Sequence, residues 1–234
     1  MKFTMQQFAE NQLNHIQERI ETACKNAGRT SESVTLIGAS KRQSPELINA
    51  FIEQGLTNLG ENYLQEAIDK QTSLAQNRAT LTWHFIGQIQ SNKTKIIAEN
   101  FDWVHGVDRL KIAQRLSKQN ISSKPLNLLI QLNPDDEQSK GGVSLKDASE
   151  LCDQIAQLDN IALRGFMMIP KARKDSSAQE SVFASANELL TLTNQQHGLS
   201  MDTLSMGMSG DLEAAIAQGS TMIRIGTDLF GART

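Results

Sequence analysis

The sequence has few cysteines, prolines and aromatic residues, and it has no long apolar run. Its two cysteines, Cys24 and Cys152, stand far apart, so we expect neither a disulfide framework nor a cysteine-based metal site. The four histidines are scattered and form no ligand motif: they are His15, His84, His105 and His197. No apolar run approaches the roughly 20 residues that a membrane-spanning helix needs. These absences favour a protein of the reducing cytoplasm.

An excess of positive charge is also lacking. Lysine and arginine number 23 against 26 aspartates and glutamates, which gives a formal net charge of −3. Such a balance provides no excess of positive charge that would attract nucleic acid or an anionic membrane. Residues 1–7 contain no hydrophobic signal core before an amphipathic stretch begins. We therefore expect no nucleic-acid partner and no membrane partner.

The sequence does contain an alternation of short apolar segments with amphipathic ones. The apolar segments, interpreted as strands, span residues 34–39, 57–60, 81–86, 102–106, 126–132, 162–167, 203–206 and 221–225. Helices are expected between them, and a further helix over residues 5–27 precedes them all. This order predicts a single α/β domain over residues 1–234, a (β/α)₈ TIM barrel with an extra N-terminal helix. A doubly wound open sheet is the alternative, but its G-x-G-x-x-G fingerprint is absent.

Residues suited to binding a phosphate gather after the last two strands. Barrels of this type form their sites at the carboxyl ends of the strands, and phosphate usually binds after strands 7 and 8. The segment SMGMSGD at 205–211 combines glycines, which allow close backbone approach, with the hydroxyl of Ser209. After the eighth strand, Gly226 and Thr227 offer a second anion contact. Each glycine alone reads as a turn or a cap, but their occurrence at both positions favours a phosphate site.

Lys41 directly follows the first strand, and it is the candidate nucleophile. The small residues at 38–40 leave room for a flat ring against the end of that strand. A lysine beside Arg224 in a partly desolvated site would have a lowered pKa, which favours imine formation with an aldehyde. A solvated loop lysine is the ordinary alternative. Lys93 and Lys140 are rivals, but neither follows a strand directly.

Three more residues complete the predicted site. Strand alternation directs Arg224 into the barrel mouth, where it would donate to a pyridine nitrogen. A salt bridge from Arg224 to Asp211 or Glu213 is the alternative. Asn62 is expected to bind a ring hydroxyl or to cap the helix that follows it. Met206 is expected to pack against a flat group.

Six segments resemble the YggS/PROSC family of pyridoxal 5′-phosphate (PLP) homeostasis proteins along nearly the whole chain. They are GASK at 38–41, GENYLQE at 60–66, WHFIGQIQSNK at 83–93, GFMMIP at 165–170, SMGMSGD at 205–211 and RIGTDLFGAR at 224–233. The resemblance implies a monomeric barrel like the N-terminal domain of alanine racemase. It also implies PLP held as a Schiff base on Lys41, its phosphate on Ser209, Gly226 and Thr227, and Arg224 near its ring nitrogen.

The same resemblance implies a role in vitamin B6 homeostasis. PLP is then the cofactor, which the protein buffers or delivers to PLP-dependent apo-enzymes without turning over a substrate. The sequence departs from the family pattern at Gln88, where proline is common, at Gly210, where an acidic residue is common, and at Asp228, where alanine is common. These departures bear on ligand exchange or surface contacts rather than on cofactor binding.

Two enzymatic functions remain open. One is a PLP-dependent amino-acid racemase, and the other is a barrel enzyme that acts on a phosphorylated sugar through a lysine Schiff base. Racemases of this barrel type carry an added β-domain. Only seven residues follow Thr227, so we expect no such domain here, and the sole tyrosine, Tyr63, would have to act as the second base. No carboxylate cluster appears at the strand ends, which disfavours the sugar enzyme.

Overall fold

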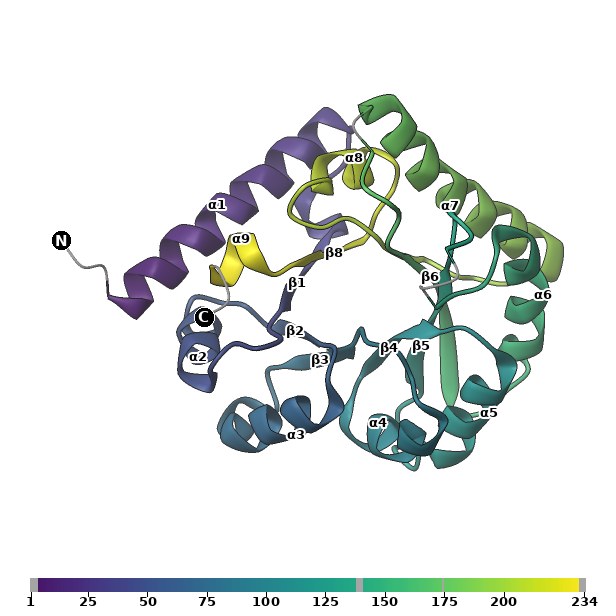
Figure 1. The fold of residues 1–234 in the computed structure, drawn as a ribbon, viewed down its shortest axis with the longest axis horizontal. Coiled ribbons are helices and arrows are strands. Elements are labelled where there is room, and N and C mark those ends of the chain that lie inside the picture. Colours follow the sequence, from purple (N-terminus) through teal and green to yellow (C-terminus); the bar gives the residue numbers. More distant parts are fainter. Residues whose placement is uncertain (1–3, 138–140, 174, 232–234) are drawn as a thin grey trace.

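A computed structural model describes residues 4–137, 141–173 and 175–231 of the chain. Eight parallel strands close into a barrel in sequence order, and helices surround it (Figure 1). The strands are β1 (Thr35–Ala39), β2 (Asn58–Glu61), β3 (Thr82–Phe85), β4 (Trp103–Val107), β5 (Leu126–Leu132), β6 (Ile161–Met168), β7 (Thr203–Ser205) and β8 (Met222–Ile225). The predicted (β/α)₈ barrel is confirmed, and β5 has the bounds expected from its apolar run.

Most helices lie where the amphipathic segments predicted them. They are α1 (Met5–Asn26), α2 (Pro45–Glu53), α3 (Leu64–Ser73), α4 (Thr94–Asn100), α5 (Leu110–Gln119), α6 (Leu145–Ala156), α7 (Ser176–His197), α8 (Leu212–Ala217) and α9 (Thr227–Phe230), with 3₁₀ turns at Ser31–Ser33, Ala75–Asn77 and Ser91–Lys93. The sequence did not indicate α9, because its four residues are too few to show a helical period.

Local capping fixes where two of these helices begin. Ser44 accepts a hydrogen bond from the Leu47 N–H (3.3 Å), and Pro45 occupies the first turn of α2. Thr4 and Gln7 form a reciprocal capping box at the start of α1. Helix α1 then packs against α2, α8 and α9, outside the β1 and β8 side of the barrel (Figure 1).

The apolar core lies mainly between the barrel wall and the helices. Phe51, Trp83, Phe166 and Phe183 are its largest fully buried side chains. Inside the barrel the packing is partly polar, because Arg224 and the histidines of β3 and β4 are also buried there. Within the described residues, no helix combines the length and apolar character needed to cross a bilayer.

Candidate functional site

A pocket of about 340 Å³ lies at the carboxyl ends of the strands. Its walls come from the segments that follow β1, β2, β3, β6, β7 and β8. It is lined by Ala39, Lys41, Asn62, Ile86, Ile169, Met208, Ser209, Gly210, Arg224, Gly226 and Thr227. Six of the seven predicted site residues are therefore brought together, because parallel strands end at the same rim of the barrel.

Lys41 lies in a tight turn that begins where β1 ends. The Gln43 N–H donates to the Ser40 carbonyl oxygen (3.1 Å), and Arg42 takes a φ of 61°. A non-glycine residue in this left-handed region costs about 1 kcal/mol, so the turn needs external support. That support comes from the Arg42 N–H, which donates to the Glu66 carboxylate.

A buried ionic cluster lies under this turn. Lys70 Nζ donates to the Ser40 carbonyl oxygen (2.6 Å), to Glu61 Oε1 (2.7 Å) and to Glu66 Oε1 (2.6 Å). The Ser40 hydroxyl also donates to Glu61 Oε1 (2.6 Å). Burial raises the pKa of the Glu61 carboxyl, and the Lys70 ammonium opposes this rise. The cluster thus holds the backbone on both sides of Lys41, and sequence reasoning did not find it.

The wall of the pocket formed after β7 and β8, next to β1, offers backbone and hydroxyl donors. The N–H groups of Ser209, Gly210 and Thr227 have no acceptor within the described residues, and neither do the hydroxyls of Ser209 and Thr227. Asp211 Oδ1 accepts from the Met208 N–H (2.7 Å) and so shapes the loop after β7. Gly207, with a φ of 95°, gives that loop its turn. Free N–H and O–H groups on two adjoining segments are suited to binding a phosphate.

Arg224 lies at the floor of the pocket and is 4% exposed. One terminal nitrogen, Nη1, donates to Ser205 O (2.6 Å) and Ser205 Oγ (2.7 Å), and Nη2 donates to Met168 O (2.9 Å). Burial lowers the pKa of its guanidinium to about 10, and the nearby Asp211 charge opposes that change. Among the described residues Arg224 forms no salt bridge, so the alternative pairing with Asp211 or Glu213 is not seen. Glu213 pairs with Arg19 instead (2.8 Å).

Asn62 is held at the rim by a close backbone approach. A Cβ atom at Gly87 would lie 2.2 Å from the Asn62 carbonyl oxygen, so only glycine fits after β3. Asn62 Oδ1 is buried and has no hydrogen-bond partner among the described residues. The helix that follows has Tyr63 at its N-cap and receives no side-chain cap, so the capping role considered for Asn62 is not observed.

Comparison with known proteins identifies the family. The family model for the N-terminal domain of alanine racemase matches residues 12–234. A pyridoxal phosphate homeostasis protein of Pseudomonas aeruginosa is 49% identical over 98% of this chain and 97% of its own. One of Escherichia coli is 43% identical over 98% of both chains. The chain belongs to the family of pyridoxal phosphate homeostasis proteins. The predicted family is thereby confirmed.

Solved structures agree with this assignment. PipY of Synechococcus elongatus, solved with PLP bound, is 35% identical, with a TM-score of 0.80 over 92% of this chain and 100% of that chain. An alanine racemase of Clostridium difficile is 16% identical, with a TM-score of 0.71 over 94% of this chain and 56% of the racemase. The second likeness shows the shared barrel fold alone.

The remaining predicted residues lie outside the pocket wall. Met206 is 1% exposed and packs in the core, while Met208, two residues later, lines the pocket. Lys93 lines a neighbouring groove together with Tyr63, and Lys140 lies outside the described residues. His84 is fully buried and hydrogen-bonded, as expected of a core histidine. Met206 and Met208 are two residues apart, so the sequence alone does not tell which of them lines the pocket. The turn at Gly207, between them, sets the course of the backbone there.

Proposed function

We propose that this protein binds PLP covalently through Lys41 and holds it for release to other proteins, without turning over a substrate. One observation carries the proposal: an amine, a set of acceptor-free donors and a buried guanidinium line the same pocket. These groups match the aldehyde, phosphate and pyridine nitrogen of PLP. PLP supplies an aldehyde with which a lysine amine condenses.

Each residue has a separate task in this proposal. Lys41 provides the amine, and the cluster of Glu61, Glu66 and Lys70 keeps its turn in place. Ser209, Gly210 and Thr227 bind the phosphate through their free N–H and hydroxyl groups. Asn62 Oδ1, which is buried without a partner in the described chain, accepts from the ring hydroxyl.

Arg224 is proposed to bind the pyridine nitrogen. A guanidinium has five N–H bonds, and three of them are used by protein acceptors, which leaves two for a ligand. The Arg224 guanidinium donates a hydrogen bond without transferring its proton, so the pyridine nitrogen stays unprotonated. Electron withdrawal by the ring is then weak, which supports storage of the cofactor rather than catalysis.

The lining of the pocket also supports a role without turnover. No carboxylate, histidine or tyrosine is among its described lining residues, so a second acid or base for a substrate is missing there. Tyr63 lines the neighbouring groove, where the Arg42 guanidinium lies 5.9 Å from its ring centre. The rim residues Met208 and Thr227 are exposed, which makes the pocket accessible to a recipient protein. Apo-enzymes that need PLP are the proposed recipients, with the protein acting as a cytoplasmic monomer.

The racemase alternative draws on the shared barrel fold. A racemase requires bases on both faces of its substrate, and the described pocket offers Lys41 alone. The names of the relatives at 43–49% identity also favour homeostasis over racemisation.

The test of this proposal is chemical trapping followed by peptide mapping. Purified protein incubated with PLP and reduced with borohydride should carry a phosphopyridoxyl group on Lys41. The Lys41→Ala variant should lose the adduct and stay folded, and the matched Lys93→Ala variant should keep it. An adduct mainly on Lys93 or Lys140 in the unmodified sequence would overturn the assignment.

A second measurement on the same material tests the absence of turnover. The PLP-loaded protein should show negligible racemisation, decarboxylation or transamination over a panel of free amino acids. Sustained turnover near the enzymatic median of about 10 s⁻¹ would favour the racemase alternative.

A further inference from the structure

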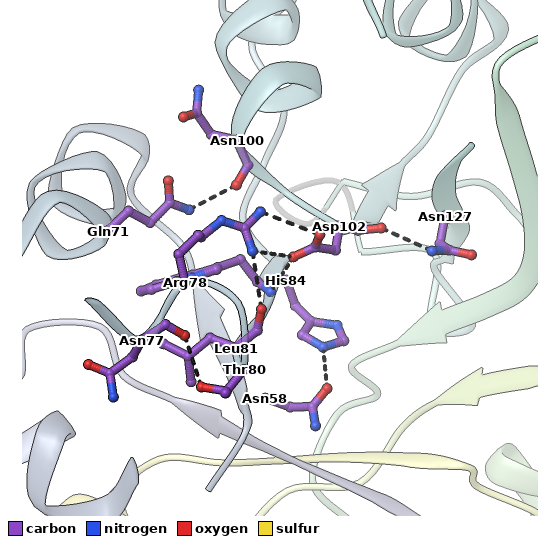
Figure 2. Close-up of polar contacts among 11 residues, drawn as sticks. Asn58, Gln71, Asn77, Arg78, Thr80, Leu81, His84, Asn100, Asp102 and Asn127 are labelled. Carbon is purple, nitrogen blue, oxygen red and sulfur yellow. Dashed lines mark hydrogen bonds and ion pairs between the residues drawn. The ribbon is translucent and has the colours of Figure 1, made fainter. Parts of the chain in front are cut away.

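A continuous line of hydrogen bonds crosses the interior of the barrel from Arg224 to the opposite end. Ser205 Oγ lies 3.0 Å from His105 Nδ1, and His105 Nε2 lies 3.0 Å from His84 Nδ1. His84 Nε2 in turn lies 3.0 Å from Asn58 Oδ1, a contact that Figure 2 shows at the amino-terminal end of β2. His84, His105 and Ser205 are fully buried. The line thus joins residues of β2, β3, β4, β7 and β8.

The two ends of the line fix the direction of its bonds. Arg224 can only donate, so Ser205 Oγ accepts from Nη1. At the other end Asn58 Oδ1 can only accept, so His84 carries a proton on Nε2. Burial keeps both rings neutral, so His84 Nδ1 accepts from the Nε2–H of His105, and His105 Nδ1 accepts from the Ser205 hydroxyl.

This order requires both histidines to be neutral. A proton added to His84 Nδ1 would face the Nε2–H of His105 across 3.0 Å, and one added to His105 Nδ1 would face the Ser205 hydroxyl proton. The O–H and N–H dipoles along the line also all point their negative ends toward the guanidinium. Arg224 forms no salt bridge among the described residues, so these aligned dipoles and two carbonyl oxygens stabilise its buried charge together with the nearby Asp211 charge.

We propose that Ser205, His105 and His84 are positioning residues that hold the Arg224 guanidinium in the orientation required at the pyridine nitrogen of PLP. The line holds Nη1 of Arg224, and two N–H bonds, one on Nη2 and one on Nε, are left for a ligand in the pocket that Arg224 lines. The role toward the ring nitrogen rests on the proposed function, whereas the direction of the hydrogen bonds does not.

The first test reads the proton positions directly in the full-length protein. Long-range proton–nitrogen NMR spectra of ¹⁵N-labelled protein distinguish the two neutral tautomers of histidine. Both His84 and His105 should be neutral with the proton on Nε2, with or without PLP. A proton on Nδ1 of either residue, or a charged ring, would overturn the proposed line. This outcome does not depend on whether the protein binds PLP.

The second test measures what the line does for the cofactor. It compares binding of PLP with binding of an analogue in which carbon replaces the ring nitrogen. The unmodified protein should prefer PLP by about tenfold, as expected for a hydrogen bond from a charged donor. His105→Leu, which removes the acceptor for Ser205, should reduce this preference by about threefold or more, whereas His105→Asn, which places an oxygen near the position of Nδ1, should retain most of it.

Ser220→Ala provides a matched control for the companion variant Ser205→Ala. Ser220 is also fully buried between β7 and β8, but its hydroxyl lies nearest the Met206 carbonyl oxygen (2.7 Å), with those of Met222 (3.1 Å) and Leu204 (3.3 Å) as further possible acceptors. Ser205→Ala should lower the preference for PLP, and Ser220→Ala should leave it unchanged. If Ser205→Ala weakened the binding of PLP and of the carbon analogue equally, Ser205 would have a purely structural role, and the inference would be overturned. No preference in the unmodified protein would instead refute the placement of Arg224 at the ring nitrogen.

Discussion

At the scale of single residues, the reactivity proposed for Lys41 depends on neighbours that are distant in sequence. Its turn places Arg42 at a positive φ, and two side chains of α3 hold the peptide groups before and after Lys41. Buried charges are tolerated only when they are paired, and here one lysine serves two carboxylates. The sequence indicated Lys41 from its place after a strand, but it gave no sign of this support.

The phosphate contacts allow a prediction at the same scale. The double variant Ser209→Ala with Thr227→Val removes two hydroxyl donors that have no protein acceptor in the described chain. We expect PLP binding to weaken by about 1–3 kcal/mol, the usual value for hydrogen bonds to a charged group. Titration calorimetry with PLP measures the loss.

Pyridoxal, which lacks the phosphate, is the control ligand for this variant. It should bind the unmodified protein much more weakly than PLP does, and the double variant should change its affinity little. If both ligands lost affinity equally, the two hydroxyls would not be phosphate contacts.

At the scale of elements, the extra N-terminal helix is tied to both proposed phosphate segments. Arg19 of α1 donates to the Ser209 carbonyl oxygen (2.9 Å) in the loop after β7. It also pairs with Asp228 (3.1 Å) in the first turn of α9 and with Glu213 (2.8 Å) of α8. Asp228, a departure from the family pattern, therefore has a local explanation. One guanidinium joins α1 to the segments that follow β7 and β8.

This arrangement predicts that α1 slows release of the cofactor. Arg19→Met should increase the dissociation rate of PLP by about threefold to tenfold, the factor that corresponds to one or two modest hydrogen bonds. The measurement is stopped-flow release of PLP into an excess of an apo-enzyme acceptor. Asp228→Ala should have a smaller effect in the same direction, because the Ser209 contact remains.

Arg29→Met is the matched control for Arg19→Met. Arg29 also lies near this side of the barrel, but it donates to the carbonyl oxygens of Ile216 and Ser33, outside the proposed phosphate segments. The Arg29→Met variant should leave the dissociation rate of PLP unchanged. Equal acceleration by both variants would indicate a general loss of stability rather than a specific link.

At the scale of the whole molecule, the barrel interior couples stability to pH. Burial lowers the pKa of His84 to about 3, and burial together with the His84 and Arg224 charges lowers the pKa of His105 well below its ordinary value. In the unfolded chain both rings take up protons near pH 6.5. The unfolded state therefore binds more protons than the folded state between about pH 6.5 and the lowered folded values, and stability falls as the pH falls through that window.

We expect the free energy of unfolding to drop by about 2–3 kcal/mol between pH 7.5 and 5.5, since each neutral histidine contributes about 1.4 kcal/mol over this interval. Urea denaturation across this range measures the drop. His105→Asn should roughly halve it, while His15→Asn on the exposed face of α1 should not change it. The raised pKa of Glu61 acts in the opposite direction, so Glu61→Gln tests that contribution separately. A stability independent of pH would contradict neutral buried histidines.

The sequence by itself determined the architecture and most of the rim of the pocket. Apolar runs and amphipathic periods predicted the eight strands, because the period of a strand or helix is a property of neighbouring residues. The position of Lys41 after β1 and of the glycine segments after β7 and β8 then followed from the rule that barrel sites form at the carboxyl ends of strands. Their roles toward PLP stay predictions. Met206 lies in the core, and Met208 lines the pocket.

Only the tertiary structure decided which side chains act on those rim residues. His105 and Ser205 are 100 positions apart, and Arg19 and Asp228 are 209 apart. Strand alternation tells which face a residue occupies, but it does not tell which residue of another strand lies opposite, because that depends on register and barrel closure. The buried line behind Arg224 and the ionic cluster under Lys41 are products of closure, so no local pattern in the chain could have revealed them.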